Sequence, residues 1–163
     1  MPSDQYNNIF SKEKSPFGDK PSGFVSKIPE ILKNGNAIDI GAGQGRNSIY
    51  LARNGFKVAA IDNSETALEL IKKSVLEENL SIDTNLVDLS KELPDTQTYD
   101  AVVISFVLHH LSKERGLELI GQLQENSKSG CIHVISTFTS EGDFYKLPQS
   151  KSKFYLEPKE LKE

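Results

Sequence analysis

The chain has 163 residues, with 19 Lys and Arg against 23 Asp and Glu, so its formal net charge is −4. This length suits one domain with its own core, and the absence of a basic block argues against nucleic acid as the main partner. No apolar run approaches the roughly 20 residues needed to cross a bilayer, and the N-terminus lacks the layout of a secretory signal. A single cysteine, Cys131, excludes an intramolecular disulfide and agrees with a reducing compartment, so we expect a cytoplasmic protein without a membrane partner.

The first 22 residues are polar and rich in turn-forming residues, yet they contain Tyr6, Ile9, Phe10 and Phe17. A disordered tail would carry fewer aromatic residues. We therefore interpret residues 1–22 as an arm that packs across the ligand cleft of the domain formed by residues 23–163, with a flexible tail as the alternative. A short helical pattern follows from Phe24, although Pro29 should interrupt it.

The most informative stretch runs from Asn36 to Tyr50. Its apolar residues Ala37, Ile38 and Ile40 predict a buried strand, which stops at three glycines spaced every second residue before a helix begins at about Arg46. Glycine is used where the backbone turns tightly or approaches a ligand, and a helix N-terminus offers unpaired amides. Strand, glycine turn and helix together predict a ligand-binding unit.

The glycine spacing departs from the dinucleotide fingerprint G-x-G-x-x-G. The third glycine comes one residue early, at Gly45, and Asp39 lies two positions before Gly41, where it would repel a pyrophosphate but could hold a cationic group. A second strand from Phe56 ends at Asp62, whose carboxylate could accept from both hydroxyls of a ribose. The pattern suits a nucleoside that carries positive charge.

Strands and helices alternate through the rest of the chain. Ser64 and Ser112 are predicted N-caps of helices that end near Glu78 and Asn126. Further strands are predicted at 82–87, 100–107 and 131–138. Five strands separated by helices imply a parallel, doubly wound sheet with right-handed crossovers, and we expect the strand order 3-2-1-4-5.

Together, these motifs resemble the class I S-adenosylmethionine-dependent methyltransferases, whose first motif is acidic-x-Gly-x-Gly-x-Gly followed by an acidic residue at the end of the second strand. Within them, the stretch Asp39 to Gly55 resembles the tellurite-resistance branch. The resemblance implies a three-layer α/β/α Rossmann-like fold, S-adenosyl-L-methionine as cofactor and a small-molecule or oxyanion methyl acceptor. The alternative is a regulatory or scaffold domain that binds the cofactor without catalysis.

The resemblance also implies which residues bind the cofactor. Asp88 would accept from the adenine amino group while the amide of Leu89 meets a ring nitrogen, and residues after the fourth strand would line the methionine and adenosine. Each has a plainer alternative: a packing turn for the glycines, a helix cap for Asp62, a surface turn for Asp88 and core for the strand-four residues. The expected cofactor-binding residues are Asp39, Gly41, Ala42, Gly43, Gly45, Arg46, Asn47, Asp62, Asn63, Asp88, Leu89, Ser105 and Phe106.

His109 and His110 are weak candidates for a general base, because similar His-His runs in the superfamily mostly shape a turn. No metal site is predicted. The ending from Phe154 resembles the segment that opens the last helix in relatives, so we expect an incomplete C-terminal region that lacks the usual antiparallel strand pair. The fifth strand would then be an exposed edge, which leaves a monomer or a homodimer paired through that edge.

Overall fold

The computed structural model describes residues 3–147 and 154–157. Within these residues, five parallel strands form one sheet in the order β3-β2-β1-β4-β5, as the sequence predicts. The strands are β1 (Gly35–Ile40), β2 (Phe56–Asp62), β3 (Ile82–Leu86), β4 (Ala101–Ser105) and β5 (Ile132–Ser136).

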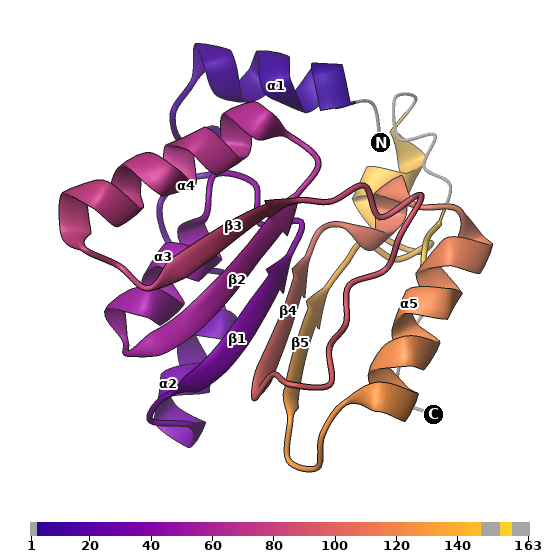
Figure 1. Cartoon of the computed structure of the whole chain (residues 1–163). Coiled ribbons are helices and arrows are strands. Elements are labelled where there is room, and N and C mark those ends of the chain that lie inside the picture. The colour runs from indigo at the N-terminus through magenta and orange to yellow at the C-terminus, as the bar shows by residue number, and fades with distance from the viewer. Residues whose placement is uncertain (1–2, 148–153, 158–163) are drawn as a thin grey trace.

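Helices cover both faces of this sheet, so the fold has three layers, with the sheet in the middle (Figure 1). The order along the chain alternates strand and helix from β1 onward, as expected for a doubly wound sheet. The helices are α1 (Ser3–Lys12), the 3-10 turn η1 (Val25–Lys27), α2 (Ile28–Ile31), α3 (Arg46–Arg53), α4 (Glu65–Glu78), the 3-10 turn η2 (Leu108–His110), α5 (Lys113–Asn126) and the 3-10 turn η3 (Asp143–Lys146).

Two buried clusters cover the two faces of the sheet, and the alternation of side chains along β1 separates them. Ala37 belongs to the cluster that contains residues of α3 and α4, whereas Ile38 and Ile40 belong to the cluster that contains residues of α5. Strands covered on both faces are almost wholly apolar, and β4 accordingly has four consecutive buried residues. This explains why the strands could be located from the sequence.

Three element boundaries have clear local causes. The side chain of Ser64 accepts from the amide of Ala67, and that of Ser112 accepts from the amide of Arg115, so both predicted N-caps are confirmed. Strand β4 is shorter than predicted because Phe106 has a φ of 56°, a left-handed conformation that leaves the strand geometry.

Residues 154–157 return to the core beside α5. Phe154 and Leu156 are buried, and Leu156 forms an isolated bridge with Thr139. Gly116 makes this packing possible, because a Cβ there would lie 2.2 Å from the Phe154 ring. Within α5, Leu119 is buried, whereas Leu117 is 43% exposed. Leu117 lies one position outside the stripe that this helix turns toward the sheet.

In the described part of the chain, β5 lies at the edge of the sheet, and pairing of two copies along it stays a prediction. Phe24 and Ile31, both largely exposed, flank a groove beside Ile132–Ile135. None of the helices in the described ranges is both long and apolar enough to span a membrane.

Candidate active site

The glycine turn follows β1 at the carboxyl edge of the sheet, where ligands bind in open α/β folds. Gly41, Gly43 and Gly45 all have positive φ, at 72°, 55° and 86°. A Cβ at Gly41 would lie 2.3 Å from a methyl group of Val107, and one at Gly45 would lie 2.5 Å from Ile71. Two of the three positions therefore require glycine for packing as well as for backbone conformation.

Asp62, at the end of β2, is bonded directly to this turn. The amide of Gly43 donates to Asp62 Oδ2 at 2.9 Å, and the amide of Ser64 donates to Oδ1 at 2.9 Å. Burial raises the pKa of the Asp62 carboxyl. Since Ser64 is the N-cap of α4, Asp62 is not the cap itself.

Asp39 lies fully buried beneath the turn. Ser48, in the first turns of α3, donates to its Oδ2 at 2.6 Å, whereas Oδ1 is buried with no hydrogen-bond partner among the described residues. Burial raises the pKa of Asp39 to about 6, against the lowering effect of Ser48. A carboxylate held in this way is poised to gain from a nearby positive charge.

Residues of the N-terminal arm contact the glycine turn and the N-cap of α4. Phe10, 4% exposed, is the nearest neighbour of Gly43, at 3.3 Å from the position of a Cβ. Asn7 accepts from the hydroxyl of Ser64 at 2.6 Å, and α1 lies along α4 at the carboxyl edge of the sheet (Figure 1). Helix α1 was not predicted, because its sequence is mostly polar.

The segment after α1 is bonded to the start of α3. Arg46 donates to the carbonyl of Phe17 at 2.8 Å, and Asn47 accepts from the amide of Ser22 at 2.9 Å. Gln44, which the sequence reasoning missed, donates to the carbonyl of Gly18 at 2.8 Å. Arg46 and Asn47 thus hold the arm in this structure, and their predicted contact with a cofactor stays a prediction.

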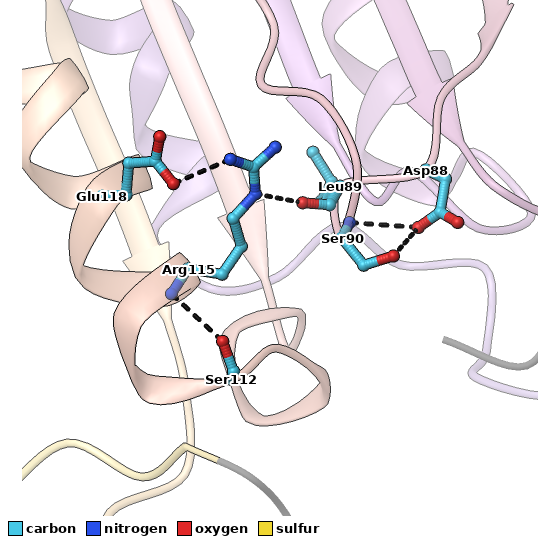
Figure 2. A network of polar contacts seen from close by, with 6 residues as sticks. All are labelled: Asp88, Leu89, Ser90, Ser112, Arg115 and Glu118. Atoms are coloured by element: carbon cyan, nitrogen blue, oxygen red, sulfur yellow. Dashed lines mark hydrogen bonds and ion pairs between the residues drawn. The ribbon is translucent and has the colours of Figure 1, made fainter.

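The loop after β3 carries Asp88 and Leu89. Asp88 Oδ1 accepts from both the amide and the hydroxyl of Ser90, at 3.0 and 2.6 Å (Figure 2). Its Oδ2 lies 3.1 Å from the ammonium of Lys91. The Ser90 hydrogen bonds, chiefly, lower the pKa of Asp88 to about 2. Leu89 is buried, and its carbonyl accepts from Arg115 of α5 at 2.6 Å.

The loops after β4 and β5 bring an aromatic cluster together, which we define as Phe106, His109, Phe138 and Phe144. The Phe138 and Phe144 rings are stacked with centroids 4.0 Å apart, and Phe106 and His109 lie 5.0 and 4.9 Å from Phe138. Phe106 is 39% exposed. The hydroxyl of Ser105, the residue before Phe106, lies 3.2 Å from the hydroxyl of Ser22. The N-terminal arm therefore also reaches the end of β4.

The two histidines are neutral at physiological pH. Burial, with the neighbouring imidazole as a smaller cause, lowers the pKa of His109 to about 4, and burial also lowers that of His110 to about 4. The Tyr6 hydroxyl lies 2.8 Å from His110 Nε2 and fixes that ring. A base with so low a pKa is a weak proton acceptor at pH 7, so a catalytic role for either histidine stays a prediction that the geometry does not strengthen.

The predicted residues therefore gather along one edge of the sheet. Asp39 is the penultimate residue of β1 and the glycine turn follows that strand. Asp62 ends β2 and is followed by Asn63, Asp88 and Leu89 come after β3, and Ser105 ends β4 and is followed by Phe106. In the described ranges, no three His, Cys, Asp or Glu side chains are grouped so that they could hold a metal ion.

Comparisons with known proteins agree with this arrangement. The family described as "Tellurite resistance protein TehB" matches residues 6–163. The "Probable S-adenosyl-L-methionine-dependent methyltransferase TehB" of Haemophilus influenzae strain 10810 is 32% identical over 121 residues, which cover 74% of this chain and 42% of the relative.

Solved structures give the same result for the fold. The crystal structure of TehB from Haemophilus influenzae superposes with a TM-score of 0.76 at 28% identity, covering 96% of this chain and 53% of that one. A DhpI complex with SAH superposes with a TM-score of 0.67 at 19% identity, covering 98% of this chain and 81% of that one, and at this identity it shows the fold alone.

The chain thus spans about half of the length of the TehB proteins it matches. The resemblance based on Asp39 to Gly55 and the predicted strand order are both confirmed. The chain belongs to the TehB family of tellurite resistance proteins.

Proposed function

We propose that this chain is an S-adenosyl-L-methionine-dependent methyltransferase that acts on a small molecule. The observation that carries the proposal is the bond between the Gly43 amide and the Asp62 carboxylate, which holds the glycine turn and the end of β2 together at the carboxyl edge of the sheet. The naming of the Haemophilus influenzae TehB relative as a probable methyltransferase with this cofactor supports it.

The residues present fit the cofactor. The three glycines leave the turn without side chains at these positions, so a nucleoside could approach its backbone closely. Asp62 would accept from the ribose hydroxyls, and Asp88 and Leu89 would bind the adenine. The buried, unpartnered Oδ1 of Asp39 favours a positively charged ligand.

When bound, S-adenosyl-L-methionine supplies an electrophilic methyl group. The protein then contributes mainly by positioning the reactants and excluding water. Phe10 over the glycine turn and the arm residues bonded to the start of α3 would exclude water from the cofactor. This division of work requires no strongly basic residue, in agreement with the low pKa values of His109 and His110.

The aromatic cluster favours an uncharged acceptor over an oxyanion. Its members offer three aromatic rings and one imidazole that is neutral at pH 7. Aromatic side chains gain mainly from apolar or planar partners, whereas an oxyanion would lose its hydration next to them without compensation. We therefore propose a neutral thiol, amine or phenol as the methyl acceptor.

Two measurements test the proposal. Calorimetric titration should show binding of S-adenosylhomocysteine and no comparable binding of NAD; binding of NAD alone would overturn the cofactor assignment. Methyl transfer from radiolabelled cofactor should then be faster to phenylmethanethiol and catechol, both uncharged at pH 7, than to selenite and tellurite. Faster transfer to the oxyanions would refute the acceptor class. Binding of S-adenosylhomocysteine without transfer to any acceptor would instead indicate a regulatory or scaffold domain.

A further inference from the structure

We propose that Arg115 is a positioning residue for adenine recognition, because it holds the peptide group between Leu89 and Ser90 in the orientation that aligns Asp88. This inference rests on the proposed cofactor site. Arg115 lies in the first turn of α5 rather than in a loop directly after a strand. It approaches the loop after β3 from the side opposite Asp88 (Figure 2).

The carbonyl of Leu89 and the amide of Ser90 belong to one planar peptide group. Arg115 Nε donates to that carbonyl at 2.6 Å, and the Ser90 amide donates to Asp88 Oδ1 at 3.0 Å. A positive and a negative side chain therefore bind the two ends of the same peptide. Each hydrogen bond involves a charged group, and hydrogen bonds in series polarise one another, so the two contacts reinforce each other.

The largely buried position of Arg115 costs desolvation of its guanidinium group, which is unfavourable for a residue that only supports a surface loop. Its side chain is 17% exposed, and Nη2 is buried with no hydrogen-bond partner in the described part of the chain. Glu118 accepts from Nη1 at 2.7 Å but is itself 59% exposed. Leaving a charged donor buried and unmatched is unfavourable, so the bond to Leu89 is the contact that accounts for the placement.

The consequence concerns the groups that would meet the base. Because the Leu89 side chain is buried and its carbonyl is held by Arg115, the residue whose amide would meet a ring nitrogen is fixed at two points. Because the Ser90 amide is held in turn, the Asp88 carboxylate is oriented to accept from an exocyclic amino group. Without Arg115 the Leu89 carbonyl loses its side-chain partner, so the alignment of both groups should loosen.

The test compares S-adenosylhomocysteine with S-inosylhomocysteine, in which the amino group that Asp88 would accept from is replaced by a carbonyl oxygen. The wild-type chain should prefer the adenosyl ligand. Arg115→Met should weaken binding of S-adenosylhomocysteine by about tenfold, the effect of one hydrogen bond to a charged group, and change binding of the inosyl ligand by less than about twofold. Arg115→Lys, which keeps one charged donor, should restore part of the preference.

Two control variants separate positioning from stability. Glu118→Gln alters the guanidinium partner that does not touch the loop, and Arg53→Met removes the paired contact of Arg53 with Glu78 at 2.7 and 2.6 Å, between α3 and α4. Both should keep the ligand preference of the wild type. In Arg115→Met, the pKa of Asp88 followed by carboxyl NMR should rise from its low value, because the Leu89–Ser90 peptide group is then less firmly aligned with the Asp88 carboxylate.

Equal weakening of both ligands in Arg115→Met, or an unchanged preference together with an unchanged Asp88 pKa, would overturn the proposal. A wild-type chain that binds the two ligands equally would overturn it as well, although binding of S-adenosylhomocysteine would still support the proposed function. If Arg115→Met does not fold, Arg115→Lys decides: a preference identical to wild type at a reduced stability would make Arg115 a structural residue only.

Discussion

Asp39→Asn should remove a pH dependence of stability that arises from one buried carboxyl. The folded-state pKa is raised from 3.8 to about 6 by burial, and the group is fully buried. As the pH rises from about 4 to about 6, the unfolded chain loses this proton while the folded chain keeps it. The folded state binds more protons in this interval, so the free energy of unfolding falls as the pH rises.

The size of the effect follows from the shift. Each pKa unit corresponds to about 1.4 kcal/mol, so a shift of about two units lowers the free energy of unfolding by about 3 kcal/mol between pH 4 and pH 7. His109 and His110, whose pKa values are lowered to about 4, contribute with the opposite sign over the same range. The wild-type curve alone is therefore ambiguous, and the difference between variant and wild type isolates Asp39.

The assay is urea denaturation of both proteins at pH 4, 5, 6 and 7. The asparagine variant should become more stable relative to wild type by about 3 kcal/mol from the lowest to the highest pH. Any constant offset, such as the cost of an unpaired Asn amide beside Ser48, shifts all pH values equally. If the free energies of unfolding of the two proteins change with pH in parallel, within about 1 kcal/mol, the pKa of Asp39 is not raised in the folded protein.

Three further variants test the site. Asp62→Ala should weaken binding of S-adenosylhomocysteine by about 1.5–3 kcal/mol in calorimetry and also lower stability, because the Gly43 and Ser64 amides lose their acceptor; unchanged affinity would refute the ribose assignment. Gly43→Val should abolish binding in the same assay, since φ is 55° and the side chain would meet Phe10; full affinity would mean that the ligand does not approach the turn. Phe10→Ala should lower the free energy of unfolding by about 3 kcal/mol in urea; an unchanged midpoint would show that α1 adds little to the fold.

The central strands were predictable because each is a short apolar run closed by a polar residue or glycine, whereas the edge strand β3 has the mostly polar sequence Ile-Asp-Thr-Asn-Leu. Ile38 and Ile40, followed by Gly41, illustrate this pattern. Right-handed crossovers limit the possible strand orders, and the resemblance to methyltransferases favoured the order 3-2-1-4-5 among them. The N-caps Ser64 and Ser112 were predictable because a capping side chain bonds to an amide only three residues away, so the signal is local in the sequence.

Contacts between distant segments could not be predicted. Helix α1 has a polar sequence and is held by Asn7 at Ser64, Tyr6 at His110 and Phe10 at Gly43, none of which is near it in the chain. Arg115 contacts a backbone carbonyl 26 residues away. Every residue has such a carbonyl, so the sequence does not single this one out. Ser48 could have been suspected as a partner of Asp39, because it is a polar residue on the buried side of a helix that follows a buried carboxylate.

The left-handed backbone of Phe106 has a consequence for engineering the protein. An aromatic residue with a φ of 56° is strained relative to glycine by roughly 1–3 kcal/mol, and 39% of Phe106 stays exposed. A selection for heat resistance alone should therefore exchange Phe106 for glycine or asparagine early, whereas a selection for methyl transfer should keep the ring. Libraries of this chain evolved under the two pressures should diverge first at this position.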